Sequence, residues 1–542
     1  MPGLSRAAVV QFARLRSAVA RRVRHGWRML TVGSRPPLVE AALDWLRAAA
    51  VSDGLAPTRG GAVPCPGLTA ATIPTLWSLG ETELPLRWAA RLIRLQNSDG
   101  SLPDAGLLHP SLFNTAQAAK AFALLDDAGA LPEAARARRK ACDFLASRIG
   151  TDGALRIPTS GGSFERWAPA TVGLTGLATV VESAEPRQIE TRRRAVLRAV
   201  DFLLRTTDAA HHAASLHVTM HGIEALLDLE EIDPRAGAAA RKFLEQTANR
   251  QSHDGSVPAD LEHTWISSAG LAHLAAMWFQ TGHKAAGDRA VACLATHQND
   301  DGAWTGSWGK GAAYFPRSPS AWTVKYALDA SVAQVAAAFD IAAPSLLETP
   351  SSDDARLRAV VDLAAKLPDE AELADVGCGS GRYLAYLAPC FPQLKLTGVD
   401  PSPRLLQQVP ASSAAVLGNA LRLPLGDARY DAAICIEALE HALTPERAVA
   451  ELCRIVRPGG RVLIIDKAAR HLSLSLHEPW ERWFTPESVS GWLAKHCDEV
   501  TCTELSAGPQ QRTPGLFLCW QGVRRAPIAS AAEPIPPQRR AA

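Results

Sequence analysis

The chain has 542 residues, of which 47% are hydrophobic and 21% charged, and its formal net charge is +2. This length is too great for one hydrophobic core and predicts two to four domains, while the charge gives no reason to expect nucleic acid as a partner. None of the ten cysteines forms a C-x-x-C pair, so we expect neither a zinc framework nor disulfides, and a reducing, cytoplasmic compartment. No apolar run reaches the roughly 18 residues needed to span a membrane.

Residues 1–35 contain eight arginines and no acidic residue. Apolar side chains recur among the arginines at helical spacing, which predicts a basic amphipathic helix. Such a helix favours peripheral contact with anionic lipid on the inner face of the membrane. The alternatives are an arm packed on its own domain and a frayed terminus.

Residues 36–345 repeat a short pattern. Asp-Gly pairs stand at 53–54, 99–100, 152–153, 254–255 and 301–302. Their spacing predicts six units of about 50 residues, one of which has lost its pair near residues 207–208. Each unit combines a charged amphipathic helix, such as 137–149 or 288–297, with a helix rich in small residues, such as 170–181 or 267–277. We therefore expect six helical hairpins that close into an (α/α)6 toroid.

The turns at 96–101 and 298–304 resemble the Q-x-x-D-G-x-W repeats of terpenoid cyclases and protein prenyltransferases. Their aspartates are expected to hold the turns. The D-x-D-D and D-D-x-x-D acid motifs are missing and aromatic content is only 6%, so terpene cyclisation is not expected.

The starts of the small-residue helices carry polar and aromatic side chains. If these ends line a cavity, the cavity suits a sugar or a polar lipid head group better than bare hydrocarbon. His217 and His221, four residues apart on one helix face, form either a metal site or a pair of hydrogen-bonded histidines. The candidate lining residues are His109, Asn114, Arg166, Trp167, His217, His221, His263, Trp265, Trp322 and Lys325.

Residues 346–355 are rich in turn formers and predict a linker, followed by a helix over 356–366 and a strand that leads to Asp375. Three glycines then fall at alternate positions, and a helix begins at Arg382. Further strands are expected at 394–399, 414–417, 430–436 and 461–466. A helix at 486–496 and strands at 499–504 and 515–521 complete a domain that spans 356–524, with a disordered tail over 525–542. Alternating strands and helices predict a doubly wound parallel sheet with its ligand at the carboxyl ends of the strands.

Residues 372–467 closely resemble class I S-adenosylmethionine-dependent methyltransferases. The resemblance rests on the D-x-G-x-G-x-G turn from Asp375, the acidic Asp400, the G-N-A at 418–420, the strand ending in L-E-H and the R-P-G-G turn. It implies a seven-stranded Rossmann-like domain that binds S-adenosylmethionine. Asp375 would orient the amino-acid part of the cofactor, Asp400 would take the ribose hydroxyls, and Asn419 and Ala420 would face the adenine. The cofactor would lie over Gly377, Cys378, Gly379 and Gly381.

The E-x-x-E-H run at 437–441 is similar to ubiquinone-pathway O-methyltransferases. That similarity implies catalytic roles for Glu437 and His441, and a divalent metal such as Mg²⁺ held by Glu437, Glu440 and His441. Without a metal, His441 is a candidate general base. The alternative is that these residues only hold the loop and cap the following helix. His477, Trp480 and Trp483 are weaker candidates for an acceptor lid.

The sequence thus predicts a methyltransferase that acts on oxygen, fused to a toroid that binds or presents a small-molecule, glycan or polyprenyl-linked acceptor. One alternative is a bifunctional enzyme whose toroid is itself a lyase, hydrolase or cyclase. The other is a binding scaffold with a regulatory methyltransferase domain.

Overall fold

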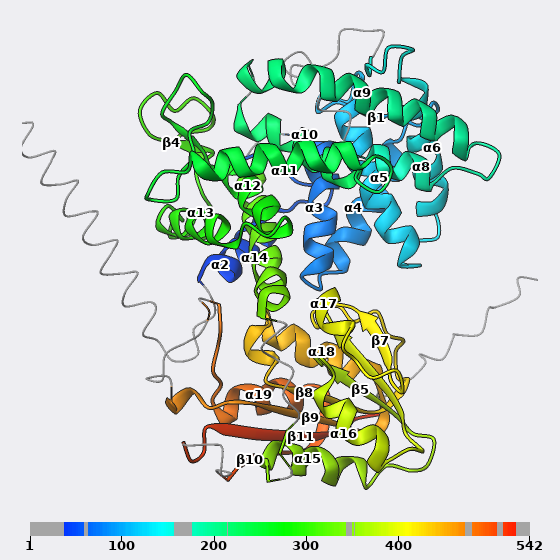
Figure 1. Ribbon diagram of the computed structural model, residues 1–542, viewed down its shortest axis with the longest axis vertical. Coiled ribbons are helices and arrows are strands. Elements are labelled where there is room, and N and C mark those ends of the chain that lie inside the picture. Colours follow the sequence, from blue (N-terminus) through cyan, green and yellow to red (C-terminus); the bar gives the residue numbers. More distant parts are fainter. Residues whose placement is uncertain are drawn as a thin grey trace, which may run out of the picture. The chain divides into compact units, whose positions relative to one another are not determined.

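A computed structural model describes residues 37–58, 63–156, 176–213, 215–342, 350–351, 353–471, 478, 480–506 and 513–526. The predicted basic helix at 1–35 and most of the predicted tail lie outside these residues. The chain divides into two compact units, the first comprising residues up to Ala342 together with Glu478–Trp480 and the second the remainder (Figure 1). Among the described residues, no helix combines the length and the apolar character needed to cross a bilayer.

The first unit is largely helical. Two pairs of two-residue strands accompany its helices: β1 (Leu102–Pro103) with β2 (Pro110–Ser111), and β3 (Ile266–Ser267) with β4 (Ser307–Trp308). The helices are α2 (Pro37–Ala49), α3 (Pro66–Ser78), α4 (Glu83–Leu95), α5 (Leu112–Asp127), α6 (Ala134–Ser147), α8 (Leu177–Glu182), α9 (Ile189–Ala213), α10 (Leu216–Asp228), α11 (Pro234–Asn249), α12 (Ser268–Gln280), α13 (Lys284–Thr296) and α14 (Ala321–Ala342).

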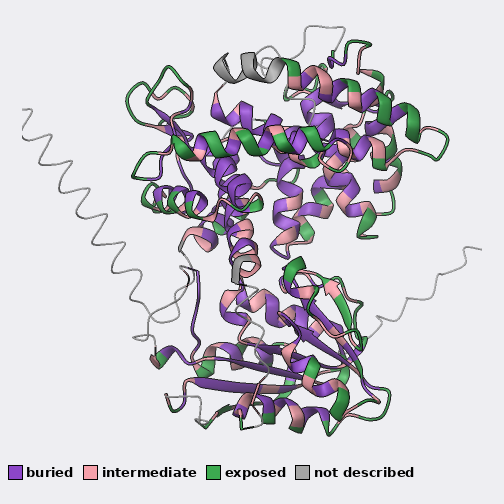
Figure 2. Ribbon diagram, in the orientation of Figure 1, coloured by how far each residue is buried: buried purple, intermediate pink, exposed green. Residues whose placement is uncertain are grey.

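Buried and half-exposed helices alternate along this unit. Helices α3, α5 and α12 are buried on nearly all sides, whereas α4, α6 and α11 bury one face only (Figure 2). The difference follows the sequence, because small residues on α5 and α12 let neighbouring helices approach from every side. Helix α3 contacts α5, α5 contacts α8, α8 contacts α10, α10 contacts α12, α12 contacts α14, and α14 contacts α3 again.

The Gln-x-x-Asp-Gly turns join each repeat to the next amphipathic helix. The side-chain amide of Gln96 donates to the carbonyl of its own Gly100 and to that of Ala137 on α6, at 3.0 Å each. Gln251 repeats this arrangement with Gly255 and Ala286. Gln298 bonds Gly302 at 2.8 Å and Leu38 of α2 at 3.0 Å, so the last of these turns holds the first described helix.

The Asp-Gly residues make these turns in two ways. The carboxylates of Asp99, Asp152, Asp254 and Asp301 each accept the backbone N–H two residues ahead, so they hold their turns as predicted. The glycines have positive φ, and at Gly302 (φ 90°) a Cβ would lie only 2.1 Å from the carbonyl oxygen of Ala41. The prediction of a lost turn near residues 207–208 is wrong, since α9 continues as one helix to Ala213.

Gly302→Ala is expected to destabilise the first unit by about 1–3 kcal/mol more than Gly282→Ala. Both glycines have similar positive φ, 90° and 84°, but a Cβ at Gly282 would meet nothing within 4 Å. The pair therefore shares the left-handed backbone strain and differs in the clash with Ala41. Denaturant unfolding followed by circular dichroism measures both variants, and equal losses would show that the close approach to α2 is not maintained.

The second unit is built on a seven-stranded sheet in the order β10-β11-β9-β8-β5-β6-β7. Strands β5 to β9 are parallel, and β11 and β10 close one edge antiparallel, as the sequence predicts. The strands are β5 (Glu372–Val376), β6 (Lys395–Asp400), β7 (Ala414–Leu417), β8 (Tyr430–Ile436), β9 (Val456–Lys467), β10 (Cys497–Glu504) and β11 (Phe517–Arg524). The helices are α15 (Ala355–Ala364), α16 (Arg382–Cys390), α17 (Pro403–Leu406), α18 (Pro445–Ile455) and α19 (Pro486–Ala494), with short 3-10 turns at Leu439–His441 and Ala469–His471.

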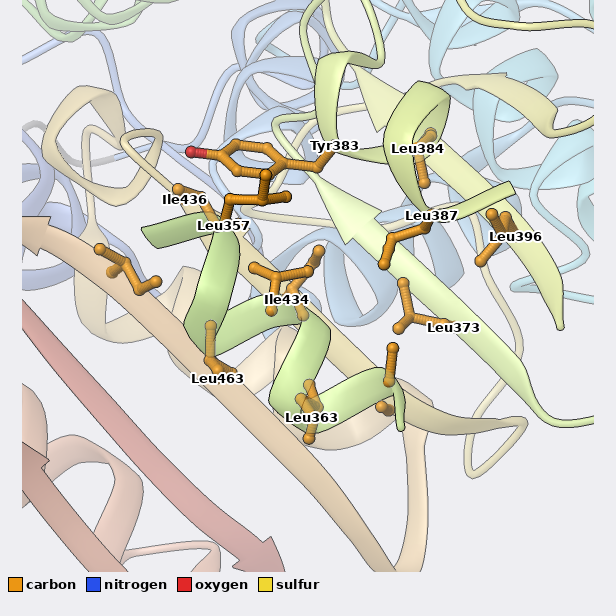
Figure 3. Packing of buried hydrophobic residues seen from close by; sticks show 14 of the residues in the cluster. Leu357, Leu363, Leu373, Tyr383, Leu384, Leu387, Leu396, Ile434, Ile436 and Leu463 are labelled. Carbon is orange, nitrogen blue, oxygen red and sulfur yellow. The ribbon is translucent and has the colours of Figure 1, made fainter. Parts of the chain in front are cut away.

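One apolar cluster fixes helices to the middle of this sheet. Leu357 of α15 and Leu384 of α16 pack with Leu373, Ile434 and Leu463 from strands β5, β8 and β9 (Figure 3). All five side chains are at most 1% exposed. Burying a leucine-sized side chain contributes about 1.5–3 kcal/mol. The cluster therefore fixes the start of α16, and with it the glycine turn at the end of β5.

Candidate functional site

The glycine turn follows β5 and leads into α16. Gly377, Gly379 and Gly381 all have positive φ, at 75°, 55° and 75°. A Cβ on Gly377 would lie 2.3 Å from the Cβ of Ala438, so this glycine is required by packing. A Cβ on Gly379 would meet nothing within 4 Å. The turn is therefore open at Gly379, where backbone can approach a ligand.

Asp400 ends β6 next to this opening. One carboxylate oxygen, Oδ2, accepts the N–H of Gly379 at 2.9 Å, and the other, Oδ1, accepts the N–H of Ser402 at 2.9 Å. The parallel pairing of β5 with β6 brings the ends of the two strands side by side. The structure thus joins the predicted ribose ligand to the predicted glycine turn.

Asp375 lies within β5 and is 1% exposed. Burial raises the pKa of its carboxyl group to about 7, the charge of Asp400 raises it further, and Arg382 opposes the shift. Its buried Oδ2 has no hydrogen-bond partner. A buried carboxyl group without a partner calls for an explanation, and a cationic ligand group beside the turn would provide one.

Cys378, Asn419 and Ala420 occupy less direct positions. The side chain of Cys378 is buried against the sheet, where a Cβ on Gly398 would lie 2.7 Å from its sulfur, so only its backbone faces the turn. Asn419 and Ala420 follow β7 and are half-buried. The side-chain oxygen of Asn419 accepts the N–H of Leu421 at 2.9 Å, which orders the turn after this strand.

Glu437 follows β8 directly and has a left-handed backbone, with φ of 53°. Its carboxylate oxygen Oε1 accepts from Arg356 and, at 2.7 Å, from Arg382. A non-glycine residue in this region is uncommon and often marks a functional constraint. Two guanidinium groups already balance the charge of Glu437, which leaves it poorly suited to bind a metal.

Glu440 and His441 belong to a second ion-pair network. Glu440 Oε1 lies 3.0 Å from the ammonium group of Lys467 and 3.3 Å from Nε2 of His441, and Lys467 also pairs with Glu481 at 2.7 Å. Burial raises the pKa of Asp466, whose Oδ2 accepts the N–H of Glu440. Glu437, Glu440 and His441 are not brought together as metal ligands, because separate cations hold the two carboxylates. The structure therefore gives no support to the predicted Mg²⁺.

Several predicted cavity residues of the first unit come together with residues that the sequence analysis missed. The rings of His217 and Trp322 have centroids 5.7 Å apart, and His221 lies 5.3 Å from His273. Tyr326 stacks on His273 at 3.9 Å. Burial lowers the pKa of all three histidines, that of His217 to about 3. His273 and Tyr326 were missed because they lie inside helices, whereas the prediction considered only the helix starts.

Other candidates lie elsewhere. His109 is exposed, and His263 is exposed and pairs with Asp260 at 2.9 Å. Arg166, Trp167 and His477 lie outside the described residues. Trp480 and Trp483 are buried, and the indole N–H of Trp483 donates to Glu481 at 3.2 Å.

Comparison with known proteins agrees with the second unit. The family described as "Methyltransferase domain" matches residues 374–464. The O-methyltransferase cnsE of Penicillium expansum is 31% identical over 24% of this chain and 49% of its own length. A tRNA (carboxymethyluridine(34)-5-O)-methyltransferase of Arabidopsis thaliana is 33% identical over 28% and 38% of the two chains.

A third relative, the chloroplastic tocopherol O-methyltransferase of Arabidopsis thaliana, is 25% identical over 28% of this chain and 52% of its own. The chain thus spans about half or less of the length of these curated relatives. The matched segment coincides with the glycine turn, Asp400 and strands β5 to β9. Residues 374–464 are therefore a class I S-adenosylmethionine-dependent methyltransferase domain.

Proposed function

We propose that the protein transfers a methyl group from S-adenosylmethionine to an oxygen atom of an acceptor that an N-terminal toroid binds or presents. The observation that carries the proposal is the opening at Gly379, which lies between the carboxylate of Asp400 and the buried carboxyl group of Asp375. Such an opening admits a ligand backbone, one acid faces hydroxyl groups, and the other compensates a positive charge.

The residues present fit this cofactor. Asp400 would hold the ribose hydroxyls, the N–H groups of the glycine turn would hold the amino-acid part, and the turn at Asn419 and Ala420 would border the adenine. Asp375 would face the positive charge of the ligand and lose its proton there. The bound cofactor supplies an activated methyl group, and the chain has to orient the acceptor and exclude water.

An oxygen acceptor is favoured by the relatives named as O-methyltransferases and by His441. The imidazole of His441 is 17% exposed, and its Nε2 lies 3.3 Å from Glu440 Oε1. In this arrangement Glu440 would orient the ring, and His441 would accept the proton of a hydroxyl group. Glu437, held by Arg356 and Arg382, would keep the loop after β8 in its left-handed conformation. The proposal uses no metal.

The toroid is supported by contacts within the first unit. The six buried helices from α3 to α14 contact one another in a cycle, and Gln298 bonds the start of α2. A polar and aromatic group of side chains lies among these helices, which suits a small-molecule, glycan or polyprenyl-linked acceptor. The tRNA substrate in the name of one relative belongs to that protein, and the net charge of +2 does not favour it here.

Calorimetric titration of S-adenosylmethionine into the full chain tests the cofactor site. Asp400→Ala removes two expected hydrogen bonds to a charged acceptor, each contributing about 1.5–3 kcal/mol, and should weaken binding about 100-fold or more. Asp498→Ala, which changes an exposed carboxylate on β10, is the matched control and should bind like the wild type. Equal affinities of wild type and Asp400→Ala would refute the assigned role.

The acceptor is identified by incubating the protein and cofactor with a radioactive methyl group in a cell extract. We expect the label in a small-molecule, lipid or glycan fraction, as an alkali-stable ether or an alkali-labile ester. Label in RNA, or on nitrogen or carbon, would contradict the proposed acceptor while leaving the cofactor site intact.

A further inference from the structure

We propose that His221, Glu224 and His273 form a binding site for a divalent transition metal, with Zn²⁺ as the first candidate. One nitrogen from each histidine and one carboxylate oxygen lie within 4.8 Å of one another. His221 and His273 are 0% and 1% exposed. Within the described ranges, with their gaps, these residues are the one group of three such ligands that is close enough to hold an ion.

The local fold places these ligands. His221 and Glu224 are three residues apart on α10 and therefore share one face of that helix. His273 comes from α12, which contacts α10. The site thus spans two repeats of the first unit and is separate from the methyltransferase domain. Two histidines and one glutamate are a recognised ligand set of catalytic zinc, in which a fourth position is left to water or substrate.

The contact between Glu224 and His273 suits a cation. Oxygen Oε2 of Glu224 lies 3.1 Å from Nε2 of His273, yet this nitrogen has no hydrogen-bond partner. Tetrahedral zinc, with bonds of about 2.0–2.1 Å, holds two of its ligand atoms about 3.3 Å apart. A zinc ion would therefore need little movement of these two groups. Nδ1 of His217 and Nδ1 of His273 are also buried without partners, which an unsatisfied metal or water site would explain.

Surrounding side chains orient the ligands. The ammonium group of Lys120 holds the other oxygen of Glu224, Oε1, and also Asp228, at 2.7 Å each, which leaves Oε2 free to face His273. Tyr326 stacks on the His273 ring, and its hydroxyl group lies 3.4 Å from His221. Such outer groups fix the orientation of metal-binding histidines.

The charge around the site tolerates a cation. Lys325 pairs with Asp329 at 2.8 Å. Three carboxylates (Glu224, Asp228 and Asp329) and two ammonium groups (Lys120 and Lys325) sum to −1, so a divalent ion would leave a charge of only +1. The sequence analysis paired His221 with His217, but the structure supplies Glu224 and His273 as its partners instead.

Zinc binding to the full chain tests this proposal. After removal of metal by a chelator, calorimetric titration with ZnCl₂ and elemental analysis should show one tightly held ion per chain. The double variant His221→Asn/His273→Asn should lose this ion, with affinity at least about 100-fold lower. His263→Asn, which changes an exposed histidine of the same unit, is the matched control and should keep it.

Two further measurements keep the test decisive. Circular dichroism shows whether the double variant is folded, and Glu224→Gln, which keeps the size of the side chain, replaces it if not. Co²⁺ in place of Zn²⁺ should give the visible absorption of a tetrahedral site in the wild type and not in the Glu224→Gln chain. Absence of zinc binding by the wild type at micromolar concentration, or equal binding by the ligand variants, would overturn the proposal.

Discussion

Gly379→Ala is expected to weaken S-adenosylmethionine binding at least about 100-fold while the methyltransferase domain stays folded. The added Cβ would meet no protein atom within 4 Å, but it would project into the opening where the proposed cofactor lies. The left-handed backbone at Gly379 costs an alanine about 1–2 kcal/mol, which a folded domain tolerates. Calorimetric titration gives the affinity, and thermal unfolding gives the stability.

Two glycines of the same unit provide the controls. Gly459 has φ of 81° and open space around its Cβ position, so Gly459→Ala carries similar backbone strain and should bind the cofactor normally. Gly377→Ala adds a clash with Ala438 and should destabilise the domain further. Normal binding by Gly379→Ala would place the cofactor away from this turn.

Asp375→Asn is expected to stabilise the second unit at pH 8 by about 2–3 kcal/mol more than at pH 5. Burial raises the pKa of Asp375 in the folded protein to about 7, above the value of about 3.9 of an unfolded chain. The folded protein therefore binds more protons between these values, and stability falls as pH rises from about 4 to about 7. Asparagine removes this penalty because it does not ionise.

Native-state hydrogen exchange of the β5 amides at the two pH values measures the effect. The comparison between pH values cancels the constant cost of burying an amide in place of the carboxyl group. The same carboxyl group predicts that wild-type cofactor binding tightens by up to about tenfold per unit as pH rises toward 7, since the cationic ligand favours the ionised form. Parallel pH curves for wild type and Asp375→Asn would refute both expectations.

Much of the second unit could be predicted because its strands are continuous apolar runs. Residues 414–417 and 430–436 were predicted with the bounds that β7 and β8 have. Strand β9 begins at Val456, five residues earlier than predicted, because the R-P-G-G segment pairs with the start of β8 before its register shifts. Strand β10 likewise begins two residues early. Turn residues hid this pairing, since local propensity does not include a partner strand.

The candidate site was predictable where strand order alone brings residues together. Asp400 meets Gly379 because β5 and β6 are parallel neighbours. The surroundings of Glu437 were not predictable in this way, since Arg356 is 81 residues away in sequence and nothing local indicates the pair. His221 and His273 likewise belong to different repeats. Spacing within one helix identifies residues on one face, but it does not identify which side chain the next helix supplies.

The hydrogen bond between Gln298 and Leu38 has a consequence for synthesis of the protein. Its partners are 260 residues apart, so the first described helix cannot acquire its final neighbours until almost the whole helical region has left the ribosome. Contacts of such long range slow folding, because a large loop must close before they form. The nascent chain would therefore expose the unpaired face of α2 throughout this interval, when a chaperone would protect it.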